Sequence, residues 1–164
     1  MKKALFIIAL SFLFVMCKST KTTTTSTSAI TEAKPTKENF IYSDGFKAAT
    51  PAQTAALLKS LDATAANYSV LVLTKNFHGE EVVVTNGSKQ VYKGYALSNG
   101  GSGIAEKIRI DNTADTKIYD SYSKKEIVIE SSDAKKYKFV HVAKDTSKKV
   151  PFVVVCSNKV KALE

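Results

Sequence analysis

The chain has 164 residues, of which 44% are hydrophobic and 24% charged, with seven Gly, three Pro and no Trp. This composition excludes collagen-like, fully disordered and multi-pass membrane proteins. Lys and Arg number 24 against 15 Asp and Glu, a formal net charge of +9. One small basic domain is therefore expected.

A short cationic start and an apolar run open the chain. Lys2 and Lys3 precede residues 4–16, in which Ser11 is the only polar residue. This layout is typical of a signal peptide. Because a membrane-spanning helix needs about 20 apolar residues, we expect residues 1–16 to be a removable leader. Its removal leaves 22 basic and 15 acidic residues, a net charge of +7.

The apolar run ends at a cysteine. Phe14-Val15-Met16-Cys17 resembles the lipobox of bacterial lipoprotein precursors, although Leu is usual in place of Phe14 and a small residue in place of Met16. The resemblance implies that Cys17 is acylated, with palmitate among its chains, and becomes the N-terminus that holds the protein on a membrane. Such loose lipoboxes, together with a Lys, Thr, Ile and Asn bias and the single Arg109, resemble lipoproteins of Bacteroidota.

The sequence leaves soluble secretion open as an alternative to lipid anchoring. For an anchored protein, it favours the outer over the inner membrane. Soluble secretion would need cleavage at a small-residue triplet such as Thr27-Ser28-Ala29, which lies far beyond the apolar run. Lys18 follows Cys17, where the inner-membrane retention signal of enterobacteria has Asp. The resemblance therefore implies the outer membrane. Since no acidic cluster marks the chain for surface export, we expect it to face the periplasm.

A polar segment separates the anchor from the folded part. Residues 17–39 contain the acylated cysteine and a stretch rich in Thr and Lys, for which we expect a disordered tether. The twenty residues 18–37 cannot span more than about 65 Å. Residues 40–164 are expected to form a single domain.

One helix is expected at the start of this domain. Thr50 is a good N-cap, Pro51 suits the first helical position, and Gln53 completes a capping box. The leucines that follow share one helical stripe, which favours packing on a sheet.

Beyond Asn67 the hydrophobic period changes from 3.6 to 2 residues. No helices alternate with the apolar runs, so the pattern predicts an antiparallel sandwich or small barrel, and we expect a β-sandwich. Eight strands are expected, near residues 69–75, 80–85, 88–96, 105–111, 116–121, 126–130, 136–143 and 151–157.

Asn86-Gly87 predicts a type I′ hairpin turn. Counting outward from this turn pairs Thr85 with Ser88, Val82 with Val91, Glu80 with Lys93, and Glu81 with Tyr92. Glu80 then lies on the same face as the core residue Val82, in an exposed ion pair at its rim. Both glutamates are therefore expected to be surface residues, not a catalytic pair.

Few residues suggest catalysis or metal binding. The only histidines are His78, expected in an exposed turn, and His141, expected to be packed on a strand. No spacing typical of metal ligands occurs, and we predict no cofactor and no metal. Cys156 lies in an apolar strand and is expected to be a buried, inert thiol, although a nucleophilic pair with His141 is left open.

One loop is a weak candidate for ligand contacts. It consists of Asn99, Gly100, Gly101, Ser102 and Gly103, and it fits neither a P-loop nor a G-x-S-x-G motif. A mobile connection between strands is the simpler interpretation, but loops at the end of a sandwich often carry function.

These observations favour a non-enzymatic lipoprotein that binds another envelope protein or serves as a structural accessory. The alternative is a module that binds glycan or anionic lipid through its many lysines. A hydrolase is a distant third hypothesis. Nucleic acid is not an expected partner, because nearly all the basic residues are Lys and the address is the envelope.

Overall fold

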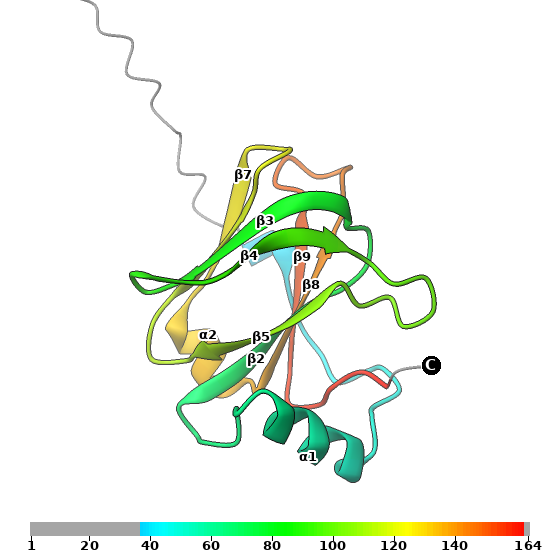
Figure 1. Cartoon of the computed structure of the whole chain (residues 1–164), viewed down its shortest axis with the longest axis vertical. Helices are drawn as coiled ribbons and strands as arrows, with labels where there is room; N and C mark the ends of the chain where they lie inside the picture. The colour runs from blue at the N-terminus through cyan, green and yellow to red at the C-terminus, as the bar shows by residue number, and fades with distance from the viewer. Residues whose placement is uncertain (1–36, 163–164) are drawn as a thin grey trace, which may run out of the picture. The chain divides into compact units, whose positions relative to one another are not determined.

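The computed structural model describes residues 37–162, which fold as a β-sandwich (Figure 1). This confirms the predicted fold class. The elements in chain order are η1 (Lys37–Asn39), β1 (Phe40–Tyr42), α1 (Pro51–Ser60), β2 (Tyr68–Leu73), β3 (His78–Asn86), β4 (Lys89–Leu97), β5 (Glu106–Asp111), β6 (Thr116–Asp120), β7 (Lys125–Ile129), α2 (Ser131–Lys136), β8 (Phe139–Lys144) and β9 (Phe152–Ser157).

Two sheets form the layers. The five-stranded sheet has the order β1-β9-β8-β2-β5, and the four-stranded sheet has the order β4-β3-β6-β7. Five strand pairings are antiparallel, whereas β1 with β9 and β2 with β8 are parallel. These two pairings depart from the antiparallel arrangement that the sequence predicts, whereas the other five follow it. Between β2 and β8 the chain passes through β3 and β4 of the other sheet, returns to the first sheet as β5, and crosses again through β6 and β7 before α2 leads into β8.

All eight predicted strands are present, with ends shifted by a few residues. Strand β1 and the short helix α2 were not predicted from the sequence, and α2 replaces the expected start of a strand at Lys136. Asn39 in η1 is buried and donates to the carbonyl oxygens of Val150 and Phe152, at 3.1 and 2.6 Å. The fold thus begins before the expected boundary at Phe40.

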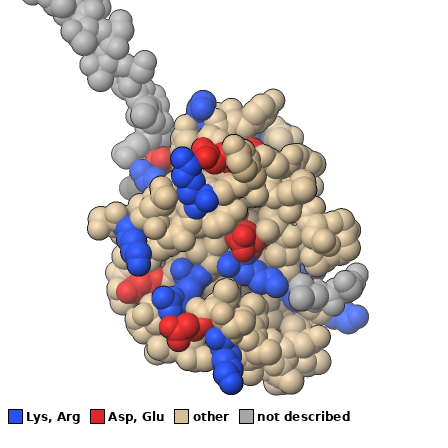
Figure 2. Space-filling model, viewed as in Figure 1, with Lys and Arg blue, Asp and Glu red and all other residues tan. Residues whose placement is uncertain are grey.

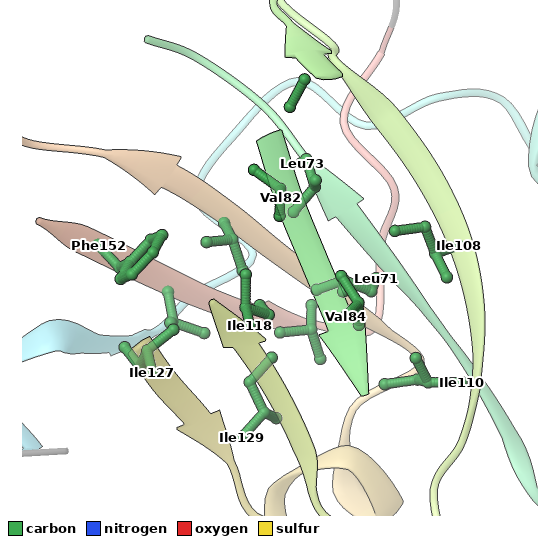
Figure 3. Packing of buried hydrophobic residues seen from close by; sticks show 14 of the residues in the cluster. Leu71, Leu73, Val82, Val84, Ile108, Ile110, Ile118, Ile127, Ile129 and Phe152 are labelled. Carbon is green, nitrogen blue, oxygen red and sulfur yellow. The ribbon is translucent and has the colours of Figure 1, made fainter. Parts of the chain in front are cut away.

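The main core lies between the sheets (Figure 3). Leu71 and Leu73 of β2 meet Val82 and Val84 of β3, and Ile118 of β6 fills the space beside them. These five side chains are fully buried. At about 0.8 kcal/mol per buried methylene, this interface provides most of the hydrophobic stabilisation.

The central strands of the five-stranded sheet are buried on both faces. In β2, Leu71 and Leu73 point toward the other sheet, while Val70 and Val72 join a second cluster on the outer face with Phe139 of β8. This explains why burial along β2 and β8 is nearly continuous and does not alternate. Leu57 and Leu58 of α1 pack against the outer cluster.

The start of α1 is as predicted. Thr50 is the N-cap, its hydroxyl oxygen accepts from the Gln53 backbone N–H at 3.2 Å, and the Gln53 side chain accepts from the Thr50 backbone N–H at 2.9 Å. Figure 1 shows α1 next to the chain that follows β9.

The predicted register of the β3–β4 hairpin was wrong. Asn86 pairs with Lys89, so the two-residue loop is Gly87-Ser88, and a bulge follows between Val84 and Thr85. The reason is the Asn86 side chain, which is buried and bonded to the turn between β5 and β6 instead of shaping the hairpin loop.

Candidate ligand-binding site

A pocket of about 270 Å³ opens on the outer face of the five-stranded sheet. The pocket lies between the sheet, α1, the segment that leads into α1, the segment after β9, and the loop before β5. Its lining residues are Phe46, Ala49, Gln53, Leu57, Val72, Thr74, Lys75, Ser102, Gly103, Ile104, Lys107, His141, Ala143, Val155, Val160, Lys161 and Ala162.

The walls of this pocket are mainly apolar. Val72, Ala143 and Val155 come from three adjacent strands, and Leu57 closes the side formed by α1. Alternation along each strand turns these residues away from the main core. Ala143 is too small to fill the space between β8 and the helix, so the outer layer is hollow there, while the inner layer is closely packed.

Three lysines surround this apolar space. Lys75 and Lys161 are exposed and Lys107 is half-buried. None of the three forms an ion pair within residues 37–162. On the face seen in Figure 2, basic and acidic residues are interspersed.

His141 contributes a buried ring to the pocket wall. Its Nε2 lies 3.4 Å from the carbonyl oxygen of Lys159, and Phe46 packs edge-on against it with ring centroids 5.6 Å apart. Burial lowers the pKa of His141, a hydrogen bond to Lys159 opposes this shift, and the charge of Lys161 adds to it. The imidazole is therefore neutral at physiological pH. The expectation of a packed strand histidine is confirmed.

Part of the weak candidate loop reaches this pocket. Ser102 and Gly103 line it, whereas Asn99, Gly100 and Gly101 do not. The Asn99 side-chain oxygen accepts from the backbone N–H groups of Gly101 and Ser102 at 2.9 and 3.0 Å, which fixes the loop as a turn. Gly103 has a φ of +66°, a conformation that favours glycine. A ligand role for this loop stays a prediction.

Cys156 and His141 do not form a nucleophilic pair. His141 stands opposite Val155 in the β8–β9 pairing, and Cys156 stands opposite Val140. Successive side chains alternate between faces, so the thiol points into the main core and the imidazole into the outer pocket. Burial raises the pKa of Cys156 to about 12. The thiol is free and buried, as expected.

A second group of polar residues lies between the sheets. Lys144 Nζ of β8 is 2.5 Å from Glu80 Oε1 of β3 and 2.7 Å from Asp120 Oδ2 of β6. The three side chains are 5%, 8% and 0% exposed. The prediction that Glu80 is a surface residue paired with Lys93 was wrong. Lys93 instead lies 3.4 Å from Glu81.

The pKa shifts of these three residues all favour their charged forms. Burial opposes ionisation of the carboxyl groups, but hydrogen bonds from Lys144 lower the pKa of Glu80 and Asp120 overall. Burial likewise opposes the ammonium, but hydrogen bonds to the two carboxylates raise the pKa of Lys144. The sequence contained a signal for this cluster, because Lys144 alternates with Val140 and Val142 on the inward side of β8.

Residues 37–162 also bear on metal binding and membrane insertion. No group of three or more His, Cys, Asp or Glu in this range is placed to hold a metal ion. No helix in the described part of the chain is long and apolar enough to cross a membrane. Comparison of the chain with protein-family models and with curated proteins found no match.

Proposed function

We propose that the protein is a non-enzymatic lipoprotein of the cell envelope whose folded domain binds an anionic amphiphile. Such a ligand has a short apolar chain and a negatively charged head group. The observation that carries this proposal is the pocket of about 270 Å³, with apolar walls and three lysines at its edge.

The two parts of the ligand match two parts of the pocket. Each methylene that enters the apolar space contributes about 0.8 kcal/mol. Lys75, Lys107 and Lys161 provide cations that no acidic residue in the described range neutralises. His141 is neutral, so the bottom of the pocket remains suited to hydrocarbon, and the head group belongs at the lysines.

The proposed anchor would place this domain near a source of such ligands. Acylation at Cys17, followed by a tether that spans at most about 65 Å, would keep the pocket close to a membrane surface. We place the protein at the outer membrane, facing the periplasm. The Cys17→Ser variant should then lose membrane association, and continued sedimentation with membranes would contradict the anchor.

Ligand binding can be tested with three probes that share one chain and differ in the head group. Titration calorimetry of the full chain with decanoate, decanol and decyltrimethylammonium should show tight binding of the carboxylate only. Binding of decanoate should weaken with salt, because the charges at the pocket edge are accessible to counterions. Equal affinities for the three head groups would contradict the proposal.

Variants of the pocket locate the binding. Ala143→Phe places a ring in the apolar space and should abolish decanoate binding, whereas Ala52→Phe on the exposed side of α1 should not. Replacing the three rim lysines by alanine should weaken binding about tenfold or more, about 1.4 kcal/mol. The matched control replaces three exposed lysines outside the pocket: Lys89, Lys135 and Lys136.

A protein partner is the second candidate function. Tyr95 and Leu97 of β4 are 77% and 65% exposed, and β4 is an edge strand of its sheet. Exposed apolar residues on an edge strand are typical of interaction surfaces. In-cell crosslinking of the tagged lipoprotein should capture one partner, and the Tyr95→Ser/Leu97→Ser variant should lose it. Capture by the variant at the same yield would exclude this surface.

A further inference from the structure

Between the sheets, a buried lysine amine lies in direct contact with two carboxyl groups with which it could form an amide bond. Lys144 belongs to the five-stranded sheet, while Glu80 and Asp120 belong to adjacent strands of the other sheet. Lys144 Nζ donates to both carboxylates, at 2.5 and 2.7 Å. A covalent bond within this group would therefore join the two layers of the sandwich.

The distance between Lys144 and Asp120 suits bond formation. When an amine nitrogen lies 2.7 Å from Asp120 Oδ2, its distance to the carboxyl carbon is about 3.5 Å, within the range from which a nucleophile attacks. Both side chains are nearly or fully buried. Hydrogen bonding keeps the resting groups ionised, because the pKa of Asp120 is lowered and that of Lys144 is raised overall. A proton must therefore pass from Lys144 to Asp120 before the neutral amine can add to the neutral acid, and burial reduces the free-energy cost of this transfer.

The carboxyl group of Asp120 is also held by donors. The backbone N–H of Tyr122 donates to Oδ1 at 3.0 Å. The backbone N–H and the hydroxyl of Ser123 donate to Oδ2 at 3.4 and 2.6 Å. Donors fixed in this way stabilise the negative charge that develops on oxygen when a nucleophile adds to a carboxyl carbon.

We propose that Lys144 and Asp120 form an intramolecular isopeptide bond, with Glu80 as the group that relays protons. Glu80 suits this role because its Oε1 accepts directly from Lys144 Nζ. The site lies between the sheets, while the ligand pocket lies on the outer face, so the inference is independent of the proposed function.

The reaction balances without another reactant. The ammonium of Lys144 transfers one proton through Glu80 to an Asp120 oxygen, and the amine then adds to the carboxyl carbon. A second proton passes from nitrogen to the same oxygen, the carbon–oxygen bond breaks, and one water molecule leaves. Glu80 ends in its starting form. Glu80 and Lys144 also line a surface depression, through which this water can escape.

Asp120, and not Glu80, is the acyl partner in this proposal. Asp120 is fully buried and has donors on both carboxyl oxygens. Glu80 lines the surface depression, and beyond its contact with Lys144 it accepts from the backbone N–H of His78 at 2.7 Å. The better-stabilised oxyanion is therefore the one at Asp120.

The test is the mass of the full chain purified from cells and denatured. The wild-type protein should be lighter than its sequence and acylation require by one water molecule. The comparison with Lys144→Arg removes any uncertainty about processing, because both proteins carry the same leader or anchor. Proteolysis of the wild type should yield a branched peptide that joins the segment containing Lys144 to the one containing Asp120.

Variants separate the roles of the two carboxylates. Glu80→Gln should keep the full mass, because no group remains to relay protons. Asp120→Ala should do the same. Lys93→Arg is the matched control, since this lysine also contacts a glutamate but is 52% exposed, and its mass should show the same missing water as the wild type.

Three results would overturn the inference. Unmodified wild-type peptides containing Lys144 and Asp120 would show that the group is an ion pair only. A branched peptide through Glu80 would reverse the assigned roles. If the mass of the Glu80→Gln variant is still lower by one water molecule, Glu80 is not the group that relays protons. The first result needs no variant, so the proposal stays testable even if a substitution prevents folding.

Discussion

Strand β8 has two sides that meet opposite surroundings. Val140, Val142 and Lys144 point toward the four-stranded sheet, whereas His141 and Ala143 point toward the outer pocket. On the inner side even the buried lysine forms ion pairs with two carboxylates, and the surrounding side chains are packed against the other sheet. On the outer side the wall is incomplete and the nearby lysines have no acidic partners in the described range. The difference indicates that the inner face serves stability, and it supports the binding role that we propose for the outer face.

The strongest test of this contrast is Lys144→Met. The substitution leaves two carboxylates buried without a cation, which costs about 3–5 kcal/mol, and loss of a covalent link would add to this. Urea denaturation measures the difference. Lys117→Met is the control, because Lys117 pairs with Glu126 at the surface, where such pairs contribute less than about 1 kcal/mol. Equal losses for both variants would contradict the special role of the inner face.

Asn86→Ala should have the next largest effect. The Asn86 amide donates to the carbonyl oxygens of Asp111 and Ala114 and to the hydroxyl of Thr116, and its oxygen accepts from the backbone N–H of Asp111. Removal of this buried side chain should lower the free energy of unfolding by about 1–3 kcal/mol. Ser88→Ala at the exposed hairpin tip should change it by less than about 0.5 kcal/mol. A near-zero effect of Asn86→Ala would mean that water replaces the amide.

Asn86 also shows what the sequence can and cannot predict. Local signals identified all eight longer strands and the start of α1, because alternation and capping depend on neighbouring residues. Asn86 was interpreted as a turn residue from local propensity, but contacts with residues 25–30 positions away determine its role. Both parallel pairings likewise depend on which strands become neighbours.

The same limit applies to the sites. The face of Glu80 was predicted correctly from alternation, but its partner Lys144 is 64 residues away and on the other sheet. The pocket was not predicted, since its lining comes from segments spread between Phe46 and Ala162. Only Ser102 and Gly103 of the candidate loop belong to it.

On the outer face, His141 predicts a pH dependence of stability. Burial lowers its pKa in the folded protein below the ordinary value of about 6.5. As the pH falls from about 7 to 5, the unfolded chain binds a proton that the folded protein does not, so stability decreases. Denaturation midpoints measured across this range should fall for the wild type and for His78→Gln, but stay nearly constant for His141→Gln.

The carboxylates of the inner face affect stability over a lower pH range than His141 does. While Lys144 and Asp120 are unlinked, the pKa values of Glu80 and Asp120 are lowered overall, so the stabilisation from these ion pairs is lost only as the pH falls below about 4. The Lys144–Asp120 bond would remove the Asp120 carboxylate from this titration. The two sides of β8 can therefore be distinguished by titration. A midpoint that is unchanged between about pH 7 and 5 in the wild type would show that His141 takes up its proton over the same pH range in the folded and unfolded states.

The smallest effect is expected at the edge of the pocket. Thr50→Ala removes the acceptor for the Gln53 backbone N–H and should cost about 1 kcal/mol, whereas Thr50→Ser keeps it. Because Gln53 and Leu57 of α1 line the pocket, a helix that frays at this end should also bind decanoate less tightly. The inner side of β8 does not contact α1, so the mass of the Lys144–Asp120 peptide should be unaffected. A loss of stability without any loss of affinity would show that the pocket does not depend on the first turn of α1.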